Sequence, residues 1–171
     1  VIANLSLVII AIYTGIAQGM QPLASQAYGK GDKNYICQLL QYGLLSVLAL
    51  SAVIYIVLFS FASPIVYIFN SEKNSLLQQI AVPGLKLYFT AIPFAGINIV
   101  LSLFFTSTDR ALPAQFISIA RGFALIIPVA FLLSVLAGMT GVWLAFPLTE
   151  SIVFVLSIIC LIVNRKIIME C

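Results

Sequence analysis

Residues 142–163 read VWLAFPLTESIVFVLSIICLIV, an apolar stretch in which Glu150 is the single charged residue. Its length matches the roughly 20 apolar residues that a helix needs to cross a bilayer core about 30 Å thick. Apolar residues occupy both parities of the stretch, whereas a strand of a membrane β-barrel alternates apolar and polar residues. The stretch therefore predicts a transmembrane helix, because backbone groups in lipid must find their hydrogen-bond partners within the segment.

Four stretches of the same kind precede it. Polar or glycine-rich segments separate them, and such segments favour loops exposed to water. The third stretch contains Pro83-Gly84 and Pro93, which remove backbone donors and predict kinks. The expected fold class is all-α, a polytopic bundle of five transmembrane helices with spans at about residues 1–27, 36–62, 76–105, 114–137 and 142–163.

The composition excludes several classes of function. Hydrophobic residues make up 63% of the chain and charged residues 8%, against about 25% charged residues in an ordinary soluble domain. Eight Lys and Arg are too few for a nucleic-acid footprint. The chain has no His, and its three cysteines are scattered, so the sequence offers no metal or haem ligand spacing and no nucleophile–base pair. We therefore expect no metal, no nucleic-acid partner and no enzymatic activity.

The basic residues near the span ends predict an orientation. Consecutive loops alternate sides, so six basic residues share one side and Lys73 alone lies on the other. The positive-inside rule places the larger set in the cytoplasm, with the carboxyl terminus, in a multi-pass protein of the cell membrane. The chain starts at Val1 with no basic region before its first apolar run, which favours a fragment over a signal peptide. The six basic residues on the predicted cytoplasmic side are Lys30, Lys33, Arg110, Arg121, Arg165 and Lys166.

Four motifs occur in an order that is typical of one family. They are GIAQGMQPL at residues 15–23 with Tyr28-Gly29, PFAGIN at residues 93–98 with Phe104-Phe105, ARGF at residues 120–123, and GVWLAFP at residues 141–147. In this order and spacing the chain resembles the carboxyl-terminal lobe of MATE (multidrug and toxic compound extrusion) transporters, helices eight to twelve of twelve. The resemblance implies five spans of a six-helix lobe, without the amino-terminal lobe and the first helix of the second lobe.

The resemblance also implies a function. Members of this family are secondary transporters that export small organic, often cationic, compounds in exchange for H⁺ or Na⁺, and no cofactor is expected besides this coupling ion. The implied partners are the lipid bilayer, the missing amino-terminal lobe and small-molecule substrates. Two alternatives stay open: a flippase for lipid-linked precursors with a related fold, and a non-transporting membrane subunit or gene remnant.

Two charged residues lie inside predicted spans. Glu150 is about 12 Å into the fifth span by helix rise, and an unpaired carboxylate at that depth costs about 2.5–3.5 kcal/mol. Glu150 is therefore either an ion-sensitive carboxylate in a central cavity or a side chain that is structurally paired or protonated. Lys86 enters the third span about 15 Å from the same side. We hypothesise a Glu150–Lys86 pair, the alternative being a Lys86 side chain that snorkels to the headgroups.

Four other residues complete the candidate substrate or ion pathway. Arg121 either lines the cytoplasmic end of a cavity or anchors the helix at the interface, and the apolar stretch that starts at Gly122 favours the anchor. Gln18, Gln21 and Asn98 are neutral polar residues within spans, suited to hydrogen bonds across helices or to ligand contacts. Gln18 and Gln21 are three residues apart, so they share a helix face.

Overall fold

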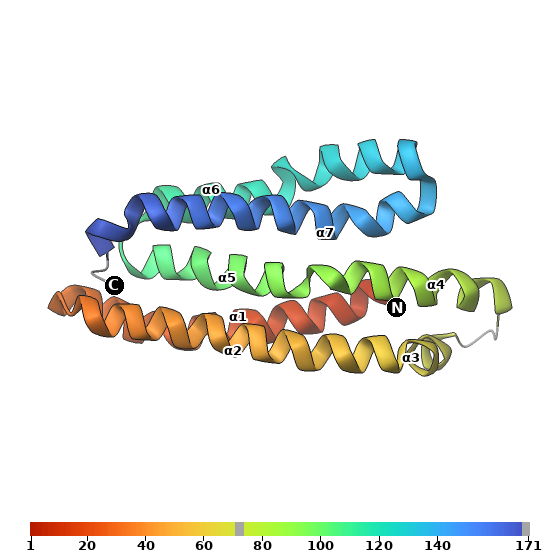
Figure 1. Cartoon of the computed structure of the whole chain (residues 1–171), viewed down its shortest axis with the longest axis horizontal. Helices are drawn as coiled ribbons and strands as arrows, with labels where there is room; N and C mark the ends of the chain where they lie inside the picture. The colour runs from red at the N-terminus through yellow and green to blue at the C-terminus, as the bar shows by residue number, and fades with distance from the viewer. Residues whose placement is uncertain (71–73, 169–171) are drawn as a thin grey trace.

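The computed structural model describes residues 1–70 and 74–168, with side chains up to Asn164. Nearly all of these residues are helical, which confirms the all-α fold class (Figure 1). A 3₁₀ turn, η1, and a π-helical turn, η2, interrupt the α-helices. The elements are α1 (Ile2–Lys30), α2 (Lys33–Ser60), α3 (Ala62–Phe69), α4 (Ser75–Tyr88), η1 (Phe89–Ala91), α5 (Ile92–Ser107), α6 (Ala111–Ile119), η2 (Ala120–Ala124) and α7 (Ile126–Ile168).

Helix α5 is the centre of the bundle. It packs against α1 and α2 on one side and against α6 and α7 on the other, as Figure 1 shows. Residues 95–101 of α5 are all buried, and the α1 residues Tyr13 and Ala17 are buried against this core. Glycine permits the close approach of the helices, because a Cβ atom on Gly96 would lie 3.2 Å from Val47 and 3.4 Å from Tyr13.

Helix α7 folds back on itself at Gly138. This glycine has φ 55° and ψ −132°, a backbone conformation outside the helical region. A straight helix from Ile126 to Glu150 would be about 36 Å long, yet Glu150 contacts Arg121, which precedes the first arm of α7. The described residues contain four long apolar helical stretches. Since the last stretch doubles back, the chain passes along the bundle five times, as the sequence predicted.

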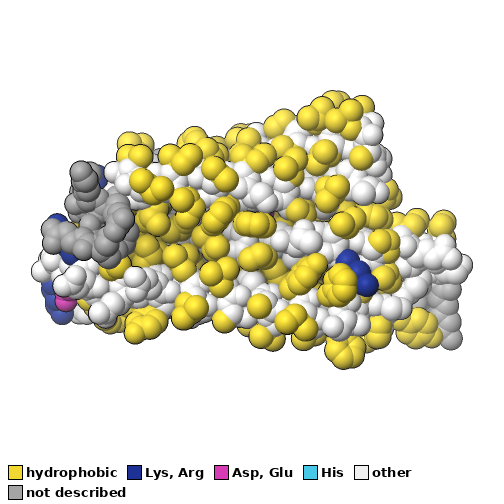
Figure 2. Space-filling model, viewed as in Figure 1, with side chains coloured by type: hydrophobic (Ala, Val, Ile, Leu, Met, Phe, Trp, Pro, Cys, Tyr) yellow, Lys and Arg dark blue, Asp and Glu magenta, His cyan; other side chains and the backbone are white. Residues whose placement is uncertain are grey.

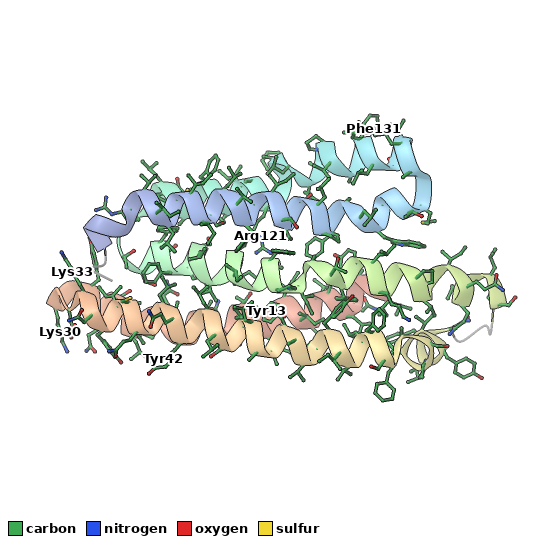
Figure 3. The ribbon with its side chains drawn as sticks, viewed as in Figure 1. Tyr13, Lys30, Lys33, Tyr42, Arg121 and Phe131 are labelled. Atoms are coloured by element: carbon green, nitrogen blue, oxygen red, sulfur yellow. The ribbon has the colours of Figure 1, made fainter. Side chains whose placement is uncertain are left out.

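The first two spans are joined by a tight turn. Gly31 takes the left-handed conformation at φ 71°. The backbone amides of Gly31 and Asp32 donate hydrogen bonds to carbonyls in the last turn of α1. At the start of α2, the Asp32 carboxylate accepts a hydrogen bond from the Tyr35 amide at 3.0 Å. Glycine at the end of one helix and Asp at the start of the next are the expected caps. Lys30 and Lys33 lie at this end of the bundle, as does the carboxyl end of α7 (Figures 1 and 3).

The structure differs from the predicted spans at two places. The second span ends at Ser60, and a separate short helix, α3, follows it. Pro64 lies in the first turn of α3, where its missing N–H would have no partner within the helix. In the third span, the break predicted near Pro93 is present as η1, whereas α4 runs through Pro83 and Gly84 without one. Lys73 lies outside the described residues.

Candidate functional site

A buried ion pair joins Arg121 and Glu150 in the interior of the bundle. The Glu150 carboxylate oxygen Oε1 accepts hydrogen bonds from Arg121 Nη2 at 2.8 Å and from Nε at 3.2 Å. The Glu150 side chain is 2% exposed and the Arg121 side chain 19%. Figure 3 shows Arg121 reaching into the space between α5 and α7. Two donors from one guanidinium fix the orientation of the carboxylate as well as neutralising it.

Asn98 of α5 completes the coordination of Glu150. Its Nδ2 donates to Glu150 Oε2 at 2.7 Å and to the Glu150 backbone carbonyl at 3.0 Å, while the Ser157 hydroxyl donates to Asn98 Oδ1 at 3.1 Å. Asn98 and Ser157 are fully buried. We call Asn98, Arg121, Glu150 and Ser157 the Glu150 cluster. Both carboxylate oxygens and the Asn98 amide oxygen therefore have partners.

The Glu150 cluster explains how a carboxylate is tolerated in an apolar bundle. A charge alone at mid-bilayer costs several kcal/mol, and a hydrogen-bonded partner of opposite charge offsets most of that cost. The partners come from α5, η2 and α7. Removing either Arg121 or Glu150 leaves the charge of the other residue buried without compensation. The ion pair and its hydrogen bonds therefore hold these three elements together.

A π-helical turn sets the direction of Arg121. The Leu125 amide donates to the Ala120 carbonyl at 3.0 Å, an i to i−5 bond that inserts one extra residue into the helical repeat. The extra residue rotates the chain after Ala120 relative to a regular helix. The sequence predicts a regular helix here and gives no sign of the turn that brings Arg121 to Glu150.

The predicted pair of Glu150 with Lys86 is therefore wrong. Glu150 is bonded to Arg121, and the Lys86 ammonium lies 4.3 Å from the centroid of the Phe59 ring instead. The interpretation of Arg121 as an interfacial anchor is also wrong, because its guanidinium is partly buried and ion-paired. Arg121 consequently leaves the set of loop charges that predicted the orientation, and five basic residues remain against Lys73.

Gln18 and Gln21 lie apart from the Glu150 cluster, on α1. Gln18 is exposed and Gln21 is half-buried. They belong to a group of polar side chains on one side of the helix, which we call the polar face of α1, made up of Thr14, Gln18, Gln21 and Ser25. Nearer the amino end, the same side of α1 carries the exposed apolar residues Leu7 and Ala11. The geometry fits the structural alternative for Asn98 and Glu150. The transport roles of all six candidates stay predictions.

The polar face of α1 contrasts with the rest of the surface. Figure 2 shows hydrophobic side chains along the length of the bundle, with acidic and basic side chains at one end and a basic patch toward the other. On α2, the exposed residues Leu45, Leu48, Val53 and Ile56 are apolar and suit contact with lipid. Glutamine amides facing lipid tails would have no hydrogen-bond partners, so the polar face of α1 requires a neighbour other than lipid.

The apolar surface, the five passes and the internally satisfied ion pair define a multi-pass helical membrane protein. Comparison with known proteins identifies the family. Residues 1–132 match the MatE family, and the chain belongs to it, which confirms the resemblance seen in the motifs.

Two kinds of curated relative illustrate the match. The FAD transporter of Shewanella oneidensis is 26% identical over 151 residues, which cover 86% of this chain and 32% of that protein. The multidrug export protein MepA of Staphylococcus aureus strains MSSA476 and MW2 is 25% identical over 141 residues, which cover 82% of this chain and 30% of that protein. The chain thus spans about a third of the length of these relatives. No solved structure matches it.

Proposed function

We propose that the protein to which this chain belongs is a secondary active transporter that exports small organic compounds, often cationic or amphipathic, in exchange for H⁺ or Na⁺. The observation that carries the proposal is the MatE match along residues 1–132. The relatives support it, since one is named as a FAD transporter and the other as a multidrug export protein. The chain acts in transport and not as an enzyme, and transport uses the coupling ion with no further cofactor.

The chain supplies five of the six helices of the carboxyl-terminal lobe in this proposal. The polar face of α1 lies towards the amino-terminal lobe and the aqueous pathway between the lobes, which accounts for amides that lipid cannot satisfy. Gln18 and Gln21 contact the substrate there. The end that carries Lys30 and Lys33 lies in the cytoplasm with the carboxyl terminus, and the protein resides in the cell membrane.

The Glu150 cluster has a mechanical part in the proposed cycle. Alternating access needs parts of the lobe to move as rigid bodies around the substrate site. The hydrogen bonds of Asn98, Arg121 and Glu150 make α5, η2 and α7 one such body. Because Glu150 neutralises Arg121, this guanidinium adds no free positive charge to a cavity, which favours export of organic cations over handling of anionic lipid-linked precursors.

Transport in a defined membrane tests the proposal. The protein is purified from membranes and reconstituted in proteoliposomes, and uptake of ethidium and of FAD is measured under an imposed pH gradient, an imposed Na⁺ gradient, or neither. We expect accumulation of at least one compound when one of the two gradients is present, and collapse of that accumulation by a protonophore or by Na⁺ equilibration. Accumulation of neither compound under either gradient would overturn the proposal.

A further inference from the structure

A positive charge lies on the membrane-facing surface between α2 and α4, far from the basic end of the bundle. Lys86 of α4 holds its ammonium 4.3 Å from the centroid of the Phe59 ring of α2, a cation–π contact. Within the described part of the chain, no carboxylate forms an ion pair with Lys86. Figure 2 shows a basic patch surrounded by hydrophobic side chains toward this end of the bundle. The charge is thus held in place without being neutralised.

The depth of Lys86 matches a headgroup boundary. Thr106, close to the basic end at Asp109 and Arg110, follows Lys86 by 20 residues, which is about 30 Å of helix. That length equals the thickness of a bilayer core, so a membrane whose boundary lies at Thr106 has its other boundary at Lys86. The helical stretch from Ser75 to Ser107 is 33 residues long and extends beyond that boundary. On this measure Lys86 lies at the boundary, whereas a count from the start of the predicted span places it about 15 Å deep.

An apolar groove begins one helical turn below this charge. It has a volume of about 400 Å³ and is lined by Leu48, Ser51, Ala52, Tyr55, Thr90 and Pro93. Tyr55 connects the groove to the lysine, because its ring lies 5.8 Å from that of Phe59. Thr90 follows Lys86 by four residues on the other wall. The groove thus runs from the boundary toward the bilayer centre, along a helix whose exposed residues Leu48 and Val53 face lipid.

We propose that Lys86 and this groove bind one anionic phospholipid from the leaflet opposite the basic end. The Lys86 ammonium contacts the lipid phosphate, and an acyl chain occupies the groove between α2 and α5. An ammonium at headgroup level attracts anionic lipid, and the Phe59 ring keeps it from turning toward the water. The groove walls are almost entirely apolar, as a hydrocarbon chain requires. The site stands on geometry alone and does not depend on the transport proposal.

Photocrosslinking tests this site. The protein in nanodiscs of phosphatidylcholine receives a small fraction of phosphatidylglycerol with a diazirine in its acyl chain, and labelled peptides are mapped by mass spectrometry. We expect labelling of the groove at Ser51 or Tyr55, which Lys86→Gln lowers about fivefold and Lys86→Arg preserves. Lys30→Gln removes the same charge at the opposite end, so it leaves groove labelling within about twofold.

Further variants and controls test the groove and the lysine separately. Ala52→Phe fills the groove and abolishes labelling, whereas Ala49→Phe, exposed on the same helix outside the groove, does not. Equal groove labelling by the phosphatidylcholine analogue, or labelling unchanged by Lys86→Gln, would overturn the proposal. Loss of the label on addition of inorganic phosphate would assign the site to free phosphate instead of lipid. A thermal melt of each variant shows that it is folded.

Discussion

The indole ring of Trp143 lies directly on the backbone of Gly84. A Cβ atom at Gly84 would be 2.4 Å from Trp143 Cε2, which is inside van der Waals contact. This contact fastens the second arm of α7 to α4, close to the point where α7 folds back at Gly138. A glycine in α4 is therefore required by the neighbouring helix, while α4 continues through this position.

Substitution of Gly84 by Ala tests this contact. The methyl group forces the Trp143 ring away, and overpacking of this kind costs about 1–3 kcal/mol. We expect Gly84→Ala to lower the melting temperature of the detergent-purified protein, as followed by tryptophan fluorescence or a thiol-reactive dye. The matched control is Gly29→Ala in α1, where the added Cβ meets no atom within 4 Å. A melting temperature that falls equally in both variants would show that the ring contact is unimportant.

The pair of Arg121 and Glu150 predicts a strong energetic coupling. Arg121→Gln and Glu150→Gln each leave one buried charge without its partner, and each should lower the free energy of unfolding by about 3–5 kcal/mol. The double variant buries two neutral amides and should lose much less than the sum of the two single effects. Unfolding in mixed micelles with increasing SDS measures all four proteins. Additive losses would mean that the two residues contribute independently.

The spans themselves were predictable because the requirement for apolar residues is local. Each pass of about 20 residues had to be apolar by itself, so the sequence located the helices independently of their packing. Turn chemistry was local as well: Gly31, Asp32 and Gly138 end or begin helices where the sequence placed breaks. The short helix α3 was not predicted, because its eight residues are too few to be recognised as a membrane span.

The choice of ion-pair partner was not predictable from the sequence. Arg121 and Glu150 are 29 residues apart, and they meet only because the π-helical turn rotates one helix and Gly138 folds the next segment back. Counting depth from the span ends placed Lys86 level with Glu150, but such a count does not show which side chains face each other. The Lys86 ammonium lies over the Phe59 ring of α2 instead. A rule based on spacing along single helices cannot supply these relationships between helices.

The predicted orientation is open to a labelling experiment. Lys30→Cys and Thr140→Cys are placed singly in a background in which Cys37, Cys160 and Cys171 are serine. Lys30 lies at the basic end and Thr140 lies two residues after Gly138, at the opposite end of the bundle (Figures 1 and 3). We expect a membrane-impermeant maleimide to label Thr140→Cys in intact cells and Lys30→Cys only after the membrane is opened. Labelling of both positions in intact cells would contradict the five-pass topology.

The polar face of α1 gives the prediction that separates transport from stability. In the proposed function Gln18 hydrogen-bonds the substrate. Gln18→Ala removes this bond, which is worth about 0.5–1.5 kcal/mol, and should raise the KM for transport about two- to tenfold. The melting temperature should stay unchanged, because Gln18 is exposed. Gln38→Ala on α2, also exposed, is the matched control and should leave KM unaltered.

A leucine at the same position distinguishes a lipid-facing helix from one that lines a pathway. If lipid covered this face, Gln18→Leu would replace an unsatisfied amide by an apolar side chain, so the melting temperature in nanodiscs would rise and transport would persist. If the face borders an aqueous pathway, Gln18→Leu loses transport and gains no stability. We expect the second result, because Thr14, Gln21 and Ser25 lie on the same polar face of α1.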